Sequence, residues 1–220
     1  MKVSRLHSWC LSPSRARAIQ ENLASQVRLE RMPEAIDLVA GADAAFCQGQ
    51  VLAVVVVVKL PELSVVEESW ARVPLRFPYV PGLLSFREGP ALIAAFRRLK
   101  TRPQAVIFDG QGIAHPRRLG LAAHLGLWLG LPSVGCAKSL LCGQFSPPGP
   151  RRGDGSPLVY QGRQVGVVLR TRDGIKPVFV SPGHLADIES AAQLVLSCAK
   201  RYRLPEPTRL ADILADRLKR

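Results

Sequence analysis

The sequence predicts an α/β fold in which a mixed β-sheet carries helices on its faces. Three observations support this prediction. Strand-like patterns with a period of two dominate residues 36–73, and the short breaks between them are typical of antiparallel hairpins. Two short apolar segments, residues 105–108 and 133–137, then alternate with helical patterns, as parallel strands joined by a helix do. Two helical patterns close the chain after residue 184.

The first element is expected to be an amphipathic helix that begins after Ser12. A serine is well suited to cap a helix N-terminus, and Pro13 is suited to the first turn. The apolar residues that recur at helical spacing after this start are Ala16, Ile19, Leu23 and Val27.

Three strands are expected next, at residues 36–47, 51–60 and 64–73. The break at residues 48–49 is short enough for a hairpin. The middle strand contains a run of β-branched valines, which predicts a central strand that is buried on both faces.

The remaining elements follow from shorter apolar patterns and from breaks at proline and glycine. The prolines of residues 74–90 indicate a shaped loop. The expected elements after it are a helix at 90–100, a strand at 105–108, a helix at 119–131, a strand at 133–137, a mobile loop at 147–157, edge strands at 165–170 and 178–181, and helices at 185–202 and 207–218.

Length, charge and cysteine content define the class of protein. A chain of 220 residues fits one domain, residues 1–220. A net charge of +13 and a pI near 10.3 predict an acidic partner, with nucleic acid the first candidate and a membrane surface the second. The longest apolar run has eight residues, too few to span a bilayer, and no signal-peptide pattern is visible. Five cysteines without a C-x-x-C pair indicate a reducing environment, so we expect a cytoplasmic protein.

Two aspartates stand out from their apolar surroundings. Asp43 lies inside an apolar strand pattern, where a carboxylate is costly to bury unless it is paired or bound to a metal. The alternative is an edge strand with Asp43 on the solvent face. Asp109 follows an apolar strand directly and precedes Gly110, a place at which open sheets bind ligands. The alternative for Asp109 is the start of a simple turn.

Two further carboxylates have stronger structural explanations. Ser85 and Glu88 have the spacing of a capping box, in which the glutamate bonds back to the serine amide. Asp212 lies on a predicted terminal helix, where most aspartates are simply solvated. Considered together, however, carboxylates on separate elements of a basic chain suggest a site for Mg²⁺, which prefers oxygen ligands. Divalent ions of this kind assist phosphodiester hydrolysis, and lysines and arginines would hold the phosphates.

Other residues near these segments have two interpretations each. Lys138 follows a strand and is suited to offset negative charge at a phosphate, or it is solvated. Tyr79 is held between Pro78 and Pro81 and is suited to wedge between stacked bases, or it is a core tyrosine. His115 follows the glycine-rich loop and could touch a phosphate, whereas His124 is expected to be packed.

At these residues the chain closely resembles the endonuclease V family. The matching blocks are spread over nearly the whole chain in family order, and the long block at residues 78–88 is unusual. They are Gly41-Ala42-Asp43; residues 78–88, which read PYVPGLLSFRE; Asp109-Gly110-Gln111-Gly112 with His115-Pro116-Arg117; Gly120-Leu121-Ala122; Gly135-Cys136-Ala137-Lys138-Ser139; Ser181-Pro182-Gly183-His184; and Pro205-Glu206-Pro207-Thr208-Arg209.

The resemblance implies a ribonuclease H-like mixed sheet with helices on both faces and a metal-dependent nuclease site. Mg²⁺, with Mn²⁺ as a substitute, would be held by Asp43 and Asp109, with Glu88 completing the catalytic carboxylates. Asp212 stands where family members carry aspartate or histidine and is a third metal ligand. Lys138 matches a lysine near the scissile phosphate. The implied nucleic-acid-binding residues are Pro78, Tyr79, Val80 and Pro81 of a strand-separating wedge, Gly82, Leu84, Gly110 and Gly135 of a base pocket, and Gly112, His115 and Lys138 beside it.

The implied function is repair of DNA that contains deoxyinosine, the product of adenine deamination. The enzyme would hydrolyse the second phosphodiester bond on the 3′ side of the lesion and leave 3′-hydroxyl and 5′-phosphate ends. An inosine pairs weakly, so its extrusion from the stack costs less than that of a normal base. We expect a monomer that binds damaged DNA and no membrane. Two alternatives remain open: an endoribonuclease that acts on inosine-containing RNA, and a binder of distorted nucleic acid without catalytic activity.

Overall fold

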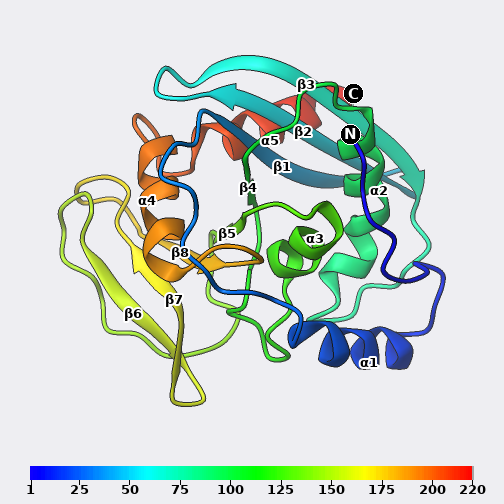
Figure 1. Ribbon diagram of the computed structural model, residues 1–220, viewed down its shortest axis with the longest axis horizontal. Coiled ribbons are helices and arrows are strands. Elements are labelled where there is room, and N and C mark those ends of the chain that lie inside the picture. Colours follow the sequence, from blue (N-terminus) through cyan, green and yellow to red (C-terminus); the bar gives the residue numbers. More distant parts are fainter. Residues whose placement is uncertain (220) are drawn as a thin grey trace.

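The protein is described by a computed structural model, which covers residues 1–219 in detail. These residues form eight strands and five helices (Figure 1). In chain order they are α1 (Pro13–Ala24), β1 (Leu38–Cys47), β2 (Gln50–Lys59), β3 (Ser64–Pro74), α2 (Leu84–Arg98), β4 (Ala105–Phe108), α3 (Leu121–Leu129), β5 (Ser133–Ala137), β6 (Gly155–Tyr160), β7 (Arg163–Leu169), β8 (Val178–Pro182), α4 (Ile188–Cys198) and α5 (Glu206–Leu218).

All eight strands form one sheet in the order β3-β2-β1-β4-β5-β8-β7-β6. The pairs β1–β4 and β4–β5 are parallel, and the other pairs are antiparallel. Because three central strands run parallel, their carboxyl ends meet at one edge of the sheet. The predicted α/β fold with a mixed sheet is confirmed.

The β1–β2 hairpin forms as the sequence predicts. Gln48 and Gly49 both have positive φ, 49° and 72°, which is the backbone of a two-residue hairpin turn. β1 lies between β2 and β4, so Asp43 is not on an edge strand. The side chains of β2 from Val51 to Val58 are all buried, which confirms that this strand is covered on both faces.

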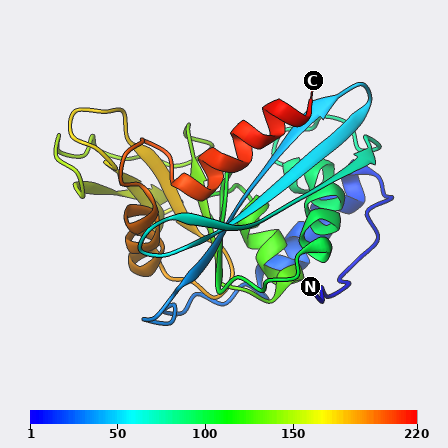
Figure 2. The ribbon, with the colours of Figure 1, turned by 90° about the horizontal axis from the view of Figure 1, so that it is seen from above.

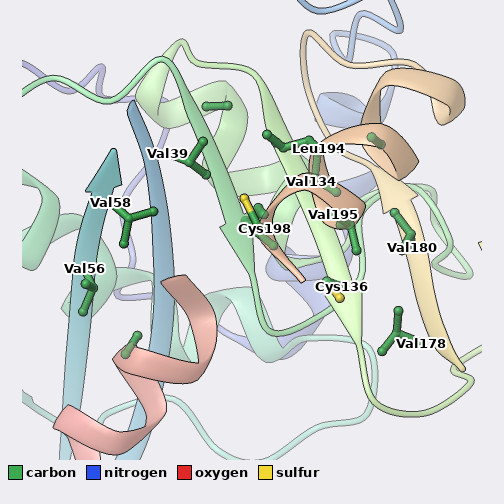
Figure 3. Packing of buried hydrophobic residues seen from close by; sticks show 14 of the residues in the cluster. Val39, Val56, Val58, Val134, Cys136, Val178, Val180, Leu194, Val195 and Cys198 are labelled. Carbon is green, nitrogen blue, oxygen red and sulfur yellow. The ribbon is translucent and has the colours of Figure 1, made fainter. Parts of the chain in front are cut away.

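Helices cover both faces of the sheet (Figure 2). On one face, α4 and α5 enclose a core built from alternate residues of the strands (Figure 3). On the other face, α2 and α3 cover a second core that includes Phe96, Phe108 and Trp128. The helix α1 packs at the periphery through Ala16 and Leu23 and is capped by Ser12, as expected.

The second helix differs from the prediction. It begins at Leu84 rather than at Pro90, so the proline lies inside the helix and the preceding loop is shorter than expected. The capping box is also wrong. The N-cap position is Leu83, whose side chain makes no capping hydrogen bond, and Ser85 lies inside the first turn, where its hydroxyl is bonded to His124 at 2.8 Å. Glu88 is thus not explained by a role at the helix end.

Two other expectations are wrong in detail. Residues 155–157, which the sequence places in a loop, belong to β6, and β6 rather than β7 or β8 forms the edge of the sheet. Asp187 caps α4 through Ser190. The His184 ring accepts a hydrogen bond from the Arg28 amide. Across residues 1–219, no helix is long and apolar enough to cross a membrane.

Candidate active site

Asp43 and Asp109 lie side by side at the edge of the sheet. Ala42 of β1 is paired with Phe108 of the parallel strand β4, so the two aspartates occupy the next position on each strand. The Asp109 amide also donates a hydrogen bond to the Ala42 carbonyl at 3.3 Å. Residues in register on neighbouring parallel strands project to the same face, so the sheet itself brings the two carboxylates together.

Asp212 reaches the same place from α5. Gly41 lies two residues before Asp43 and faces the start of this helix, where a Cβ on Gly41 would lie 2.1 Å from the Pro207 carbonyl carbon. The missing side chain therefore lets α5 approach β1 closely. Repulsion from Asp212 contributes to the raised pKa of Asp43, which places their charges close together.

Glu88 approaches from the first turns of α2 and is buried. Its carboxyl interacts with both Asp43 and Asp109. Four carboxylates that are far apart in the sequence are thus near enough to influence one another's charge, and all four are residues that the sequence singled out.

The electrostatics of this cluster are those of uncompensated negative charge. Burial, followed by repulsion from Asp109 and Asp212, raises the pKa of Asp43 to about 7. Burial, followed by repulsion from Asp43 and Asp109, raises the pKa of Glu88 to about 8. Strongly perturbed carboxyl groups are typical of functional sites.

Lys138 provides the opposite charge. Its ammonium lies 2.6 Å from an Asp109 oxygen. Among the described residues, this is the one ion pair that any of the four carboxylates forms. Burial lowers the pKa of Lys138, but the hydrogen bond to Asp109 and the attraction of the three aspartates outweigh it, so the pKa is raised. The lysine follows β5 and is 44% exposed, so it remains accessible to a ligand.

The donor set suits a hard divalent cation, because it offers only carboxylate oxygens. Among residues 1–219, no three histidine, cysteine, aspartate or glutamate side chains stand close enough together to hold a metal ion. The raised pKa values of Asp43 and Glu88 nevertheless show that the cluster gains from further positive charge. The residues therefore fit Mg²⁺ in chemistry.

A stiff turn projects beside the carboxylates. Residues 80–83 form a type II turn, closed by a 3.0 Å bond from the Leu83 amide to the Val80 carbonyl, with Gly82 at φ +77°. Tyr79 precedes this turn and is 73% exposed, which excludes a core role. The Arg87 guanidinium lies 5.8 Å from the Tyr79 ring centre and supports it from below.

A pocket of about 380 Å³ is lined by this turn and, among the four carboxylates, by Asp109. Its volume is in the usual range for a small-molecule site. The predicted residues that line it are Tyr79, Val80, Pro81, Gly82, Leu84, Asp109, Gly110, His115 and Lys138.

Three predicted binding residues do not line the pocket: Pro78, Gly112 and Gly135. Gly112 packs against β8 and donates its amide to the Ser181 hydroxyl at 2.7 Å. Gly135 lies under the loop at residues 110–112, where a Cβ would be 2.5 Å from the Gly110 carbonyl oxygen. Both glycines shape the pocket by allowing close backbone packing.

The structure adds polar residues that the sequence did not single out. Gln20 of α1, Gln111 and Ser139 all line the pocket. The Gln111 amide nitrogen is bonded to the Ser139 carbonyl, whereas its buried oxygen has no partner among the described residues. The sequence contained one signal that Gln20 has a role: this polar residue interrupts the apolar stripe of the first helix between Ala16 and Leu23.

A mixed sheet with clustered carboxylates at the ends of adjacent parallel strands, a nearby lysine and a basic chain defines a nuclease of the ribonuclease H-like class. Comparison with known proteins specifies it further. A family model described as Endonuclease V matches residues 21–213. The Endonuclease V of Methanothrix thermoacetophila is 47% identical, and the match covers 98% of this chain and 96% of the relative. The chain belongs to the endonuclease V family and is a nuclease that hydrolyses phosphodiester bonds.

Solved structures agree with this assignment. The crystal structure of the Endonuclease V from Streptomyces avermitilis matches with a TM-score of 0.92 at 42% identity, over 96% of this chain and 94% of that one. The Endonuclease V of Ciona intestinalis has been crystallised with a 24mer DNA that contains an inosine followed by a ribo-adenosine. It is 24% identical, with a TM-score of 0.82 over 93% of this chain and 96% of that one, and shows the shared fold.

Proposed function

We propose that this protein is a repair endonuclease that recognises deoxyinosine in DNA and hydrolyses the second phosphodiester bond on its 3′ side. The single observation that supports this most is the pocket that an exposed, turn-held tyrosine shares with Asp109 of the carboxylate cluster and with Lys138. Such a site can accept an extruded base on one side and a backbone phosphate on the other. The inosine-containing DNA bound by the Ciona protein is a precedent for this substrate within the fold.

In this proposal Asp43, Asp109 and Asp212 hold Mg²⁺, for which Mn²⁺ can substitute. When bound, such an ion would lower the pKa of water and stabilise negative charge on phosphate oxygens. Glu88 is buried beside the aspartates, where it positions the metal or the attacking water. Lys138 adds positive charge at the scissile phosphate, a role supported by its position on Asp109.

The segment at residues 78–81 acts as a wedge. Tyr79 is mostly exposed, whereas Pro81 and the hydrogen bond across the turn keep its support stiff. A rigid aromatic side chain can enter the base stack at the lesion and separate the strands. The extruded base then enters the pocket, where Gly82, Leu84 and Gly110 leave backbone groups within reach.

The test uses a labelled duplex with one deoxyinosine beside an identical duplex with adenine. Each is incubated with Mg²⁺ or with EDTA, and the nick is mapped to the nucleotide. We expect a metal-dependent nick beyond the 3′ neighbour of the lesion, with 3′-hydroxyl and 5′-phosphate ends. Equal cutting of both duplexes would contradict the proposal, and cutting restricted to an inosine-containing RNA of the same sequence would identify a ribonuclease instead.

We further propose that the whole chain acts as one domain, as a monomer in the cytoplasm. One sheet runs through the entire fold, which supports a single unit. All five cysteines are free, and Cys136 and Cys198 are buried in the core, as expected in a reducing compartment. Light scattering of the purified protein should give the mass of one chain, and a dimer mass would contradict the proposal.

A further inference from the structure

The turn that carries the wedge is fixed by one carbonyl group. The oxygen of Gly82 accepts hydrogen bonds from three side chains: Gln20 at 3.0 Å, His115 at 2.9 Å and Arg117 at 3.0 Å. A carbonyl oxygen has two lone pairs, so three donors saturate it. The peptide that follows Gly82 is thereby held in one orientation, and the stiff turn cannot rotate about it.

The hydrogen-bond network also determines the protonation of His115. Its Nδ1 accepts the Arg117 amide hydrogen at 3.1 Å, so the ring hydrogen must be on Nε2, which donates to Gly82. The ring is buried, and this burial lowers the pKa of His115 to about 4. His115 is therefore a neutral donor to the turn rather than a cation for phosphate.

Gln20 links the members of this network. Its amide nitrogen donates to Gly82 and also to the Leu119 carbonyl at 2.9 Å, while its oxygen accepts from the Arg117 side chain at 2.6 Å. Only 1% of Gln20 is exposed. A buried amide of this kind connects α1 to two segments that are 62 and 99 positions away in the chain.

We propose that Gln20 is a positioning residue for strand separation, which keeps Tyr79 in place through the Gly82 carbonyl. The residue lies on α1, just outside the part of the chain that the family model matches. It does not reach the carboxylate cluster through any hydrogen bond that the structure shows for it. Gln20 also lines the pocket, so its effect on the wedge must be measured apart from its effect on binding of the base. This inference rests on the proposed function.

The two effects can be separated by the choice of substrate. In a duplex the wedge must open the stack and break a base pair before the base can enter the pocket. In a single strand the inosine is already unpaired, so a misplaced wedge matters less. A residue that holds the wedge should therefore change the ratio of duplex cleavage to single-strand cleavage, whereas a general loss of stability lowers both rates.

The variant Gln20→Met keeps the length of the side chain and removes its donor and acceptor. We expect its duplex-to-single-strand rate ratio to fall by about tenfold, since three hydrogen bonds of ordinary strength are lost. Gln20→Glu retains the acceptor for Arg117 but cannot donate to Gly82, and should lower the same ratio. Asn22→Leu, an exposed amide on the same helix, is the control and should leave it unchanged.

Base extrusion can also be measured without cutting. In an Asp43→Asn background, the fluorescence of a 2-aminopurine beside the inosine should increase when the base stack opens. Adding Gln20→Met should reduce this fluorescence increase on the duplex. Equal losses on both substrates in Gln20→Met and Gln20→Glu, or an unchanged ratio, would overturn the role of Gln20 and leave the proposed function intact. Failure of the wild-type protein to cut either inosine substrate would overturn both.

Discussion

Gly41 of β1 lies against Pro207 at the start of α5 so closely that a Cβ on the glycine would be 2.1 Å from the proline carbonyl carbon. This contact sets the position of the helix that carries Asp212. One missing methyl group therefore determines whether the fourth carboxylate can join the other three.

Gly41→Ala should damage both stability and activity. The methyl group meets backbone atoms, which cannot rotate away, so α5 must shift. Overpacking of this kind costs about 1–3 kcal/mol in the free energy of unfolding. We expect cleavage to fall further than the loss of folded protein explains, as measured by urea unfolding and by cleavage at matched folded concentrations. Gly49→Asn is the control, because its turn is open and asparagine tolerates positive φ. Normal activity in the Gly41→Ala variant would show that α5 need not approach β1.

Asp43→Ala should abolish cleavage without loss of DNA binding. We expect the rate to fall by roughly a hundredfold or more, as when a preorganised charge is removed from an active site. Affinity for the inosine duplex should be kept or increased, because one fewer carboxylate repels the phosphate. Fluorescence anisotropy measures binding and gel assays measure cleavage. Cutting at the normal rate would show that the metal assignment is wrong.

Glu88→Gln should stabilise the metal-free protein at alkaline pH. The Glu88 carboxyl has a pKa of about 8 in the folded chain against an ordinary value of 4.5. Between these values the folded state binds more protons than the unfolded state, so wild-type stability decreases as pH rises. The glutamine removes this cost, with an expected gain of roughly 1–3 kcal/mol at pH 8 and less at pH 5.

Urea unfolding in EDTA at both pH values measures this difference. The exposed Glu62→Gln is the control, and its stability should track the wild type at each pH. A loss of stability in Glu88→Gln at pH 8 would mean that Glu88 is held charged by a partner.

Lys138→Met should slow cleavage by about a hundredfold while leaving the fold intact. The ammonium is 44% exposed and contacts Asp109 at 2.6 Å, so its main role is electrostatic at the site. Lys176→Met removes the same charge from an exposed position and controls for the general attraction of DNA. Because that attraction weakens with salt, both variants are compared at two salt concentrations. Equal effects of the two substitutions on the cleavage rate would show that Lys138 has no specific role at the active site.

Local patterns were enough to predict most of the sheet. The valine run predicts a doubly covered strand, and the short break before it predicts a hairpin, because both depend on residues that are neighbours in the chain. The second helix could not be bounded in this way. Pro90 suggests a helix start, but tertiary packing of α2 against the sheet extends the helix back to Leu84 and keeps the proline in its interior.

The same limit applies to the candidate site: local patterns identify some of its residues, but not the roles that depend on distant partners. The sequence identifies Asp43, Asp109 and Lys138 because each carries a charge in or directly after an apolar strand. It misassigns Glu88 to a capping box, because the helix begins at Leu84 and places Ser85 inside the first turn, where its hydroxyl bonds to His124, 39 positions away. Such long-range partners cannot be inferred from spacing along the chain.

The sequence by itself determined the class of fold, the nature of the reactive groups and the family. These depend on patterns of polarity and on residue types that are readable in order along the chain. Only the tertiary structure decided which groups meet: that Gly41 admits α5, that Gly112 and Gly135 pack behind the pocket, and that Gln20 bonds to the Gly82 carbonyl. The physical reason is that each of these contacts joins segments far apart in the chain, and steric fit and hydrogen-bond geometry exist only once the sheet and helices are packed together.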